Sequence, residues 1–394
     1  MKEKIFEYIV ITVSNELQKR KVEEILEKRK KLNIIPTETK YIIIVEKEKI
    51  GSGGAIFNLI KYFYSINSIK EFEKSKILLI NSAGDSKRNI LYADTGKIYI
   101  PTFRKIENKI DSTIFDEIIK ETNQIGKIMN SGILIVSGDC TTEYNKNFSE
   151  KLINNTAISV KANIKIGERH GVFVVENGKL RESLQKNTEQ QLKEKKAVDS
   201  NNNVNIDTGI IYFNSNTLNK IKNIIFTDNK IDDKKAKRII NKDVRLNFYT
   251  DFIYPLSKTA KLEKYLEAKA EIDLNPQIID VRKQLWDVLH EEELDVLEIE
   301  DGRFIHYGTV KEFIDKSFEI NKNNYIQNSI ISKSTIGKNT INENNRSLWE
   351  CKLYTIEKNK EKAIDSALNL YYNLQNDNYD ILKEKRLSIE EILN

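Results

Sequence analysis

The chain has 394 residues, enough for two domains with separate hydrophobic cores. Its 64 Lys and Arg residues are interleaved with 59 Asp and Glu residues, so the net charge of +5 describes a solvated, mildly basic surface, not a nucleic-acid-binding face. The two cysteines and three histidines have no zinc-ligand spacing, and no apolar run approaches the length of a membrane span. We therefore expect a cytoplasmic protein with no nucleic-acid or membrane partner, and the run MKEKIFEYIVITVS predicts a first strand rather than a signal peptide.

Apolar runs and amphipathic segments alternate through the first two thirds of the chain. The predicted strands and hairpin segments are, in chain order, Tyr8 to Val13, Tyr41 to Val45, Ile77 to Ile80, Gly132 to Asp139, Ala157 to Ile164, Gly171 to Leu184 and Val204 to Phe213. An amphipathic helix is predicted from Asn15 to Leu32, and a second helix opens at GSGGAIFNLI. The pair Asn177–Gly178 predicts a tight hairpin turn. This alternation indicates an α/β sheet with crossover helices.

The pattern changes after about residue 270, where short strand-like runs replace the alternation. Ile330 and Ile336 lie six residues apart and Gly337 follows, which is typical of one or two coils of a hexapeptide β-helix, although ordinary strands show this spacing too. The segment from Glu357 to the end is charged and helix-prone. We therefore predict an α/β domain at residues 1–270, a small β-rich, β-helix-like domain at 271–355 and a helical tail at 356–394.

A group of cations follows the predicted strand that ends at Ile80, in the run INSAGDSKRNILYADTGK. The small residues there are Ser82, Ala83 and Gly84, and the cations are Lys87, Arg88 and Lys97. Small residues leave the backbone open to a ligand, and the cations can neutralise phosphate charge. A solvated basic loop is the alternative. The position favours phosphate binding, because ligands bind at the carboxyl ends of strands in open α/β sheets.

Glycines also follow the second predicted strand, in the run GSGG from Gly51 to Gly54. Glycines at the start of a helix let a ligand approach the backbone, and the helix N-terminus favours an anion or a polar base edge. The run completes neither G-x-G-x-x-G nor the Walker A motif. Taken alone, it favours a tight strand-to-helix turn over a binding loop.

Asp139 ends another apolar strand in the run SGD. A carboxylate at that point must be paired, bind a metal or cap a helix. Magnesium that binds substrate phosphates uses one or two carboxylates and keeps several waters. Asp139 is therefore a candidate magnesium ligand, and Asp251 in FYTDFIYPL is a candidate second ligand.

Together these motifs resemble a known family, the sugar-1-phosphate nucleotidyltransferases. The general resemblance rests on the GDSKR…GK loop, the GD carboxylate and the hairpin GVFVVENGKLRESLQK. Four runs resemble one branch, the L-fucose-1-phosphate guanylyltransferases and the matching domain of bifunctional L-fucokinase/GDP-fucose pyrophosphorylase: GSGGAIFNLI, SAGDSKRNILYADTGKIY, VDSNNNVNIDTGIIYFN and FYTDFIYPLS followed by FIHYGTVKEF. Their order covers the chain from Tyr8 to about Asn342.

The resemblance implies a role for each matching residue. It makes residues 1–270 a catalytic domain with a Rossmann-like nucleotidyltransferase sheet. Nucleotide binding falls to Gly51, Ser52, Gly53, Gly54, Ala83, Gly84 and Lys87, with Arg88 and Lys97 as catalytic cations. Lys186 is both catalytic and sugar-phosphate-binding, and His170, Gly171, Asp207, Thr208 and Gly209 face the sugar. Asp139 and Asp251 hold Mg²⁺.

The implied reaction joins GTP and L-fucose-1-phosphate into GDP-L-fucose and pyrophosphate. The chain departs from the family pattern at Ala83, Asn89, Gln185 and Asn187, without loss of a charge that phosphoryl transfer requires. Nothing resembles the phosphate loop of a sugar kinase, so we expect a fucokinase partner or a lost kinase domain. Three alternatives stay open: a related nucleotidyltransferase with another sugar or base, a glycosyltransferase, and a non-catalytic sensor on the same fold.

Overall fold

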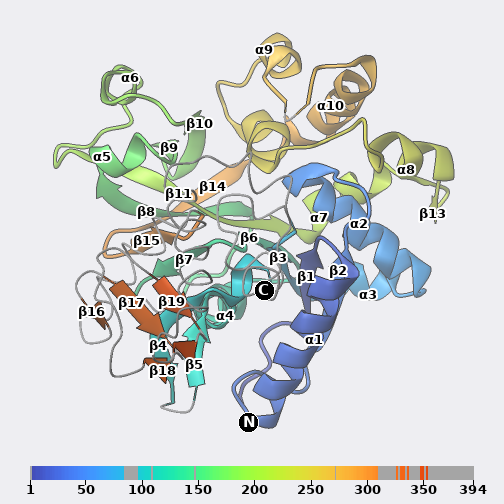
Figure 1. Ribbon diagram of the computed structural model, residues 1–394. Coiled ribbons are helices and arrows are strands. Elements are labelled where there is room, and N and C mark those ends of the chain that lie inside the picture. The colour runs from blue at the N-terminus through green and yellow to red at the C-terminus, as the bar shows by residue number, and fades with distance from the viewer. Residues whose placement is uncertain are drawn as a thin grey trace, which may run out of the picture. The chain divides into compact units, whose positions relative to one another are not determined.

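The computed structural model describes residues 2–83, 96–107, 110–145, 148–270 and 272–308, and the backbone of five short strands between residues 325 and 353 (Figure 1). The chain forms two compact units. The first comprises Met1–Gly84 and Phe115–Ile305, and the second comprises Asp85–Ile114 and His306–Asn394. Each unit is described by itself.

One half of the first unit's large sheet is parallel, as the alternation predicts. Its strands are β2 (Lys40–Val45), β1 (Tyr8–Val13), β3 (Lys76–Asn81) and β6 (Gly132–Ser137), in this spatial order. Every neighbouring pair among them is parallel, so all four carboxyl ends reach the same edge of the sheet. The predicted strands are confirmed to within two residues at each end. In an open α/β sheet this edge is where ligands bind.

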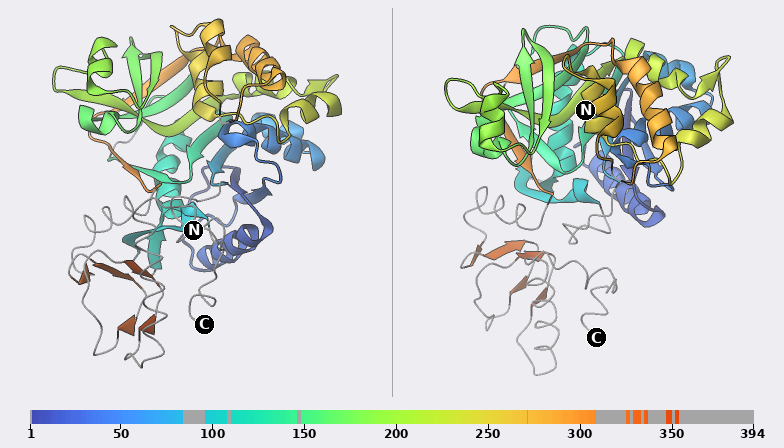
Figure 2. Two further views of the ribbon diagram at one scale, coloured as in Figure 1. Left: turned by 45° about the horizontal axis from the view of Figure 1, so that its top comes forward. Right: turned by 90° about the horizontal axis from the view of Figure 1, so that it is seen from above.

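The other half of the sheet continues from β6 through β11 (Asn203–Asn214), β8 (Asn155–Asn163), β14 (Leu294–Ile299), β10 (Lys179–Gln185) and β9 (Gly171–Glu176). β11 also pairs with β9, so these five strands close into a ring. The turn between β9 and β10 is the predicted hairpin, with positive φ at both Asn177 (53°) and Gly178 (74°). In both views of Figure 2 the green β9–β10 hairpin lies at the end of the first unit opposite the blue helices.

Helices cover both faces of the parallel half (Figure 1). On one face α2 (Gly51–Ser65), α3 (Ile69–Lys74), α7 (Ser215–Asn223), α8 (Asp233–Ile239) and α10 (Pro276–Leu289) share a single hydrophobic core with the strands. The other face is covered by α1 (Glu16–Lys31) and α4 (Ile114–Ile128). A buried ion pair joins these two helices, because Arg29 Nε and Nη2 donate to the Asp116 carboxylate at 2.6 and 2.7 Å. In the described part of the chain, both faces of the parallel half are therefore covered by helices.

The remaining elements of the first unit are short. They are β7 (Cys140–Glu143), α5 (Ile164–Gly167), α6 (Glu189–Glu194), β12 (Phe226–Thr227), β13 (Lys230–Ile231), the π-helical turn Phe248–Ile253, the 3-10 turn Tyr254–Leu256, α9 (Leu262–Glu267) and β15 (Arg303–His306), whose last residue belongs to the second unit. No helix in the described ranges has both the length and the apolar character needed to cross a membrane.

The second unit is built from short strands. It contains the 3-10 helix Lys97–Tyr99 and the antiparallel pair β4 (Pro101–Ile106) and β5 (Ile110–Thr113). Towards the C-terminus lie β16 (Tyr325–Ile326), β17 (Ser329–Ser332), β18 (Thr335–Ile336), β19 (Ser347–Trp349) and β20 (Lys352–Leu353). β17 pairs with β19 and β18 with β20, in parallel. The β-helix-like domain stays a prediction, and the helical tail from residue 356 lies outside the described residues.

The domain boundary predicted at residue 270 needs correction. Helix α10 and strand β14 follow that position and belong to the first unit, which continues to Ile305. β14 is an internal strand of the large sheet and pairs in parallel with β8 over six residues, from Leu294 opposite Asn155 to Ile299 opposite Val160. The second unit also takes in residues 85–114, which the prediction assigned to the first domain.

Candidate active site

The strand that carries Asp139 ends at the ligand-binding edge of the sheet. β6 ends at Ser137, and the side chain of Asp139 folds back to it: Ser137 Oγ donates to Asp139 Oδ1 at 2.6 Å. The Cys140 thiol donates to the same oxygen at 3.4 Å. Asp139 is half-buried, so its carboxylate is held in place yet within reach of a ligand.

A bulge in β11 brings Asp207, Thr208 and Gly209 to the same edge. Residues 207 and 211 pair with β8, but the three residues between them break the ladder. Gly209 has φ +72°, and its N–H donates to Asp207 Oδ1 at 2.9 Å. A Cβ at Gly209 would lie 3.4 Å from the Cβ of Ser137. The bulge therefore lies against the end of β6, the strand that leads to Asp139. These residues were predicted to belong to one site, and they lie close together.

Only one oxygen of the Asp207 carboxyl group accepts a hydrogen bond from a described residue. It is 5% exposed, and Oδ2 has no hydrogen-bond partner among the residues that the structure describes. Burial raises the pKa of this carboxyl to about 7, against the lowering effect of the Gly209 N–H. A buried acceptor without a donor is costly, so this oxygen marks a place where a ligand can supply one.

The β9–β10 hairpin supplies three more predicted residues beside Asp207. Gly171 faces Gln185 in register, and a Cβ at Gly171 would lie 3.3 Å from Asp207 Oδ2 and 2.8 Å from Gln185 Nε2. The absence of a side chain at Gly171 thus lets a carboxyl and an amide approach its backbone closely. Lys186 follows Gln185, is exposed, and donates its N–H to the carbonyl of His170 at 3.3 Å. The structure therefore brings His170, Gly171 and Lys186 together with Asp207.

A side chain at two of the glycines in the GSGG segment would clash with neighbouring residues. A Cβ at Gly51, where φ is +78°, would lie 2.3 Å from the carbonyl oxygen of Leu246. A Cβ at Gly53 would lie 2.6 Å from the ring of Phe252, and the Gly53 N–H donates to the Leu246 carbonyl at 2.8 Å. The segment therefore forms the tight strand-to-helix turn that the sequence favoured. Nucleotide binding by this segment stays a prediction.

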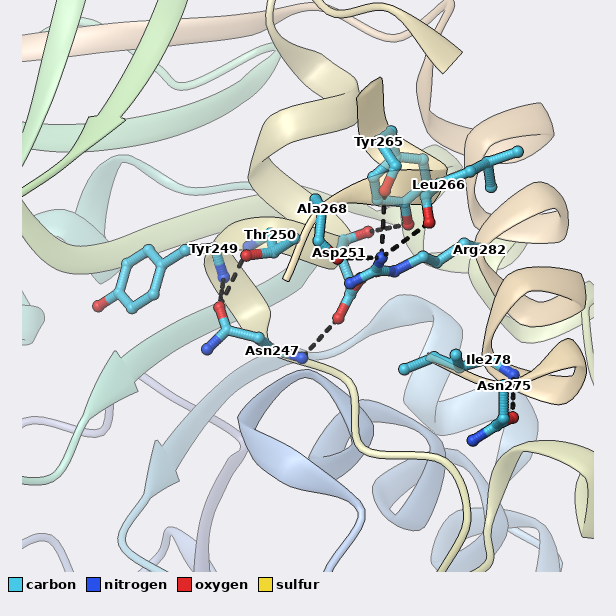
Figure 3. A network of polar contacts seen from close by, with 10 residues as sticks. All are labelled: Asn247, Tyr249, Thr250, Asp251, Tyr265, Leu266, Ala268, Asn275, Ile278 and Arg282. Atoms are coloured by element: carbon cyan, nitrogen blue, oxygen red, sulfur yellow. Dashed lines mark hydrogen bonds and ion pairs between the residues drawn. The ribbon is translucent and has the colours of Figure 1, made fainter. Parts of the chain in front are cut away.

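Asp251 is placed differently from the metal ligand that the sequence predicted. Its side chain is fully buried, and Oδ1 accepts from Arg282 Nε at 2.8 Å (Figure 3). Oδ2 accepts from the N–H of Asn247 at 2.6 Å. Both oxygens are thereby engaged inside the protein, as in a structural ion pair. We therefore do not retain Asp251 as a magnesium ligand.

Tyr249, two residues before Asp251, is the residue that sequence reasoning missed. Figure 3 shows its side chain pointing away from Asp251 and Arg282. A Cβ at Gly209 would lie 3.3 Å from the Tyr249 hydroxyl. Burial, followed by the charges of Asp207, Cys140 and Asp139, raises the pKa of this phenol well above its usual value. The only signal in the sequence was its neighbour in FYTD, because a tyrosine in an apolar run is usually a core residue.

A second carboxyl, half-buried, lies at the ends of the parallel strands. Glu46 directly follows β2, and burial raises its pKa to about 7, while a hydrogen bond with Thr12 lowers it. Thr12 Oγ1 also accepts the N–H groups of Ser82 and Ala83, each at 3.2 Å. The Thr12 hydroxyl therefore fixes the beginning of the loop that was predicted to bind phosphate.

The cations that were predicted to bind phosphate stay predictions. Lys97 begins the 3-10 helix of the second unit, and its side chain is half-buried. Gly84, Lys87 and Arg88 lie outside the described residues. The structure therefore brings together the predicted sugar-facing residues and Asp139, and the predicted triphosphate residues beyond Ala83 remain predictions.

Asp139 offers a carboxylate, the type of ligand that a hard cation prefers. Carboxylate oxygens are what Mg²⁺ prefers, and Mg²⁺ completes its shell with water and substrate phosphates. Asp139 is half-buried at the strand end and offers one carboxylate. A divalent cation at this strand end would have one protein carboxylate, not the predicted pair.

Comparison with known proteins places the chain in a family. The family model for the fucose pyrophosphorylase domain matches residues 69–353, more than half of the chain. The chain belongs to the fucose pyrophosphorylase family. The matched range contains Asp139, the β9–β10 hairpin, the β11 bulge and the Asp251 turn, whereas the GSGG segment precedes it.

Two curated relatives of this fucose pyrophosphorylase family member are named fucose-1-phosphate guanylyltransferase. The protein from Mus musculus is 23% identical over 340 residues, which cover 78% of this chain and 56% of the relative. The protein from Homo sapiens is 23% identical over 337 residues, covering 78% and 54%. The chain thus spans about half the length of the curated relatives it matches.

Among solved structures, HddC from Yersinia pseudotuberculosis complexed with GMP-PN is similar over 80% of this chain and 100% of that chain. The identity is 10% and the TM-score is 0.33, a likeness too loose to support a conclusion about fold or function.

Proposed function

We propose that this chain is a sugar-1-phosphate nucleotidyltransferase that forms GDP-L-fucose and pyrophosphate from GTP and L-fucose-1-phosphate. The family match over residues 69–353 carries the proposal. The grouping of Asp139, Asp207, Gly171 and Lys186 at one edge of the sheet supports it, because these residues offer a metal ligand, hydroxyl acceptors and a phosphate-binding cation.

In the proposed reaction a phosphate oxygen of the sugar phosphate attacks the α-phosphorus of GTP. A new P–O bond forms there as the bond to the pyrophosphate oxygen breaks, and pyrophosphate leaves. The attacking oxygen is already anionic, so the reaction needs no strong general base. The work of the protein is alignment and neutralisation of charge.

The residues divide this work between the two substrates. Lys186, exposed at the end of β10, binds the phosphate of the sugar phosphate. The sugar lies over Gly171 and the β11 bulge, beside His170. The GSGG segment and Ala83 to Lys87 bind the nucleotide, and Arg88 and Lys97 neutralise the charge that grows on pyrophosphate.

Magnesium would be held by Asp139 together with phosphate oxygens of the substrate. When bound, the ion supplies positive charge to the phosphate oxygens. Ser137 Oγ, which donates to Asp139 Oδ1, orients the carboxylate for this purpose.

The reverse reaction tests this proposal with one defined substrate pair. With GDP-L-fucose, pyrophosphate and Mg²⁺, the chain is expected to produce GTP, and Lys186→Ala should lower the rate sharply. Lys237→Ala, which removes an exposed lysine of α8, is the matched control and should leave the rate unchanged. If no GTP forms although GDP-L-fucose is shown to bind, the non-catalytic sensor becomes the better account.

A further inference from the structure

A single polar turn anchors Tyr249 beside the carboxyl groups of the candidate site. The turn is the π-helical segment Phe248–Ile253, a rare conformation that is frequent at functional sites. Asn247 caps it, because its Oδ1 accepts the N–H groups of Tyr249 at 3.0 Å and Thr250 at 3.1 Å. The direction of the Tyr249 side chain is thereby tied to the position of Asn247.

The Asp251–Arg282 ion pair fixes Asn247 in turn. Asp251 Oδ2 accepts the N–H of Asn247, and Oδ1 accepts Arg282 Nε (Figure 3). Arg282 is locked on α10 because its Nη1 donates to the carbonyls of Tyr265 at 3.1 Å and Ala268 at 2.7 Å. A chain of hydrogen bonds therefore leads from a buried guanidinium to the residue that bears the phenol.

The main chain of the turn has a separate attachment to the GSGG segment. The N–H of Phe248 donates to Ser52 Oγ at 3.1 Å, and the Gly53 N–H donates to the carbonyl of Leu246 at 2.8 Å. These bonds do not involve Arg282. Loss of the ion pair should therefore disturb the Tyr249 side of the turn more than the segment assigned to the nucleotide.

The surroundings of the phenol favour a hydroxyl group as its ligand. Within the described ranges, Asp207 Oδ2 has no hydrogen-bond partner, and the Tyr249 hydroxyl lies against Gly209 of the same bulge. A sugar hydroxyl can donate to the carboxylate and accept from the phenol at the same time. A phosphate group offers the carboxylate no donor and is repelled by it.

We propose that Tyr249 contacts a hydroxyl of the sugar-phosphate substrate beside Asp207, and that Asp251 and Arg282 are positioning residues that act through Tyr249. This inference rests on the proposed function for the identity of the substrate. It assigns to the FYTD run a role in sugar recognition in place of metal binding.

Steady-state kinetics of the full chain tests the first part. Tyr249→Phe removes only the hydroxyl and should raise the KM for L-fucose-1-phosphate about five- to tenfold, the scale of one lost hydrogen bond, with the KM for GTP unchanged. The control is Tyr64→Phe, since Tyr64 packs against Phe226 and should affect neither constant. An unchanged KM for L-fucose-1-phosphate in Tyr249→Phe would overturn the inference while leaving the proposed function in place.

The positioning role is tested by combining substitutions. Arg282→Lys keeps the charge but cannot reproduce the guanidinium bonds, and should raise the same KM in the wild-type background. In the Tyr249→Phe background it should raise this KM no further, although it should lower the stability of the fold equally in both. A KM effect that multiplies in the double variant, or that falls equally on GTP, would show that Arg282 acts only through the general fold.

If the wild type is inactive, the proposed function is refuted. The inference about Tyr249 is then tested by a binding measurement. Calorimetric titration with L-fucose-1-phosphate would then be compared between wild type and Tyr249→Phe. Binding that weakens at least fivefold in the variant supports the inference. Equal binding by both proteins, or no binding by the wild type, overturns it.

Discussion

Arg282 Nε lies 2.8 Å from Asp251 Oδ1, and both side chains are completely buried. A buried charge pair of this kind contributes little net stability, because removing two charges from water offsets their attraction. Removal of one partner is different, because it leaves the other charge buried and unpaired. The pair therefore constrains the structure of the turn more than it stabilises the whole fold.

Asp251→Asn is expected to destabilise the first unit by about 3–5 kcal/mol, since it leaves the Arg282 guanidinium without a counter-charge. Urea denaturation measures this loss, with Asp280→Asn on the exposed side of α10 as the control. The magnesium concentration for half-maximal turnover should not change. Unaltered stability together with a raised magnesium requirement would restore the prediction that Asp251 is a metal ligand.

Asp207→Asn should stabilise the protein at neutral and higher pH. The folded pKa is raised from 3.8 to about 7, so the folded state retains this proton longer than the unfolded state does. The wild-type free energy of unfolding therefore falls, on account of this group, as the pH rises from about 4 to 7. The variant lacks this loss. Its free energy of unfolding should exceed that of the wild type by a difference that grows from near zero at pH 4 to the order of 4 kcal/mol above pH 7.

Denaturation of both proteins at a series of pH values would measure the difference, with Asp228→Asn at an exposed turn as the control. A difference that does not vary with pH would contradict the raised pKa of Asp207. The same variant should be less active, since Asn has one acceptor oxygen and cannot carry the negative charge.

Gly51→Ala should destabilise the chain more than Gly178→Ala. The two glycines have nearly the same φ, +78° and +74°, so both substitutions carry a similar backbone cost of about 1 kcal/mol. Only the Cβ at Gly51 meets a neighbour, the Leu246 carbonyl oxygen at 2.3 Å, whereas nothing lies within 4 Å at Gly178. Equal losses in urea denaturation would show that the close approach to Leu246 is not structurally important.

Asp139→Asn should lower magnesium-dependent turnover on the order of 100-fold or more, because the remaining amide binds Mg²⁺ poorly and charge on the phosphates is left uncompensated. Initial rates over a range of magnesium concentrations test this. Asp243→Asn, at an exposed position, serves as the control. Rates that match the wild type at every magnesium concentration would exclude Asp139 as the ligand.

The strands of the first unit were predictable where local pattern was sufficient. The continuous apolar run from Tyr8 to Val13 and the turn at Asn177–Gly178 both follow from short-range sequence. β14 was not placed in the main sheet, because its partner β8 lies far earlier in the chain and no local feature identifies that pairing. This explains why the domain boundary was predicted too early.

The site shows the same division between local and distant information. Asp139 could be found because a carboxylate after an apolar strand is a local signal. Asp251 was a candidate from the run FYTDFIYPL and from the family resemblance, but its partner Arg282 lies on α10, and a single sequence does not show that the two meet. Tyr249 was missed because only the approach of the β11 bulge, at Gly209, makes its hydroxyl part of a site.

The most direct test of the central claim is pyrophosphate release in the presence of magnesium. Each of the four nucleoside triphosphates would be combined with L-fucose-1-phosphate and with a panel of other sugar-1-phosphates. We predict release with GTP and L-fucose-1-phosphate, at rates well above those of every other pair. Preferred release with a different pair, or no release with any of them, would contradict the proposed reaction.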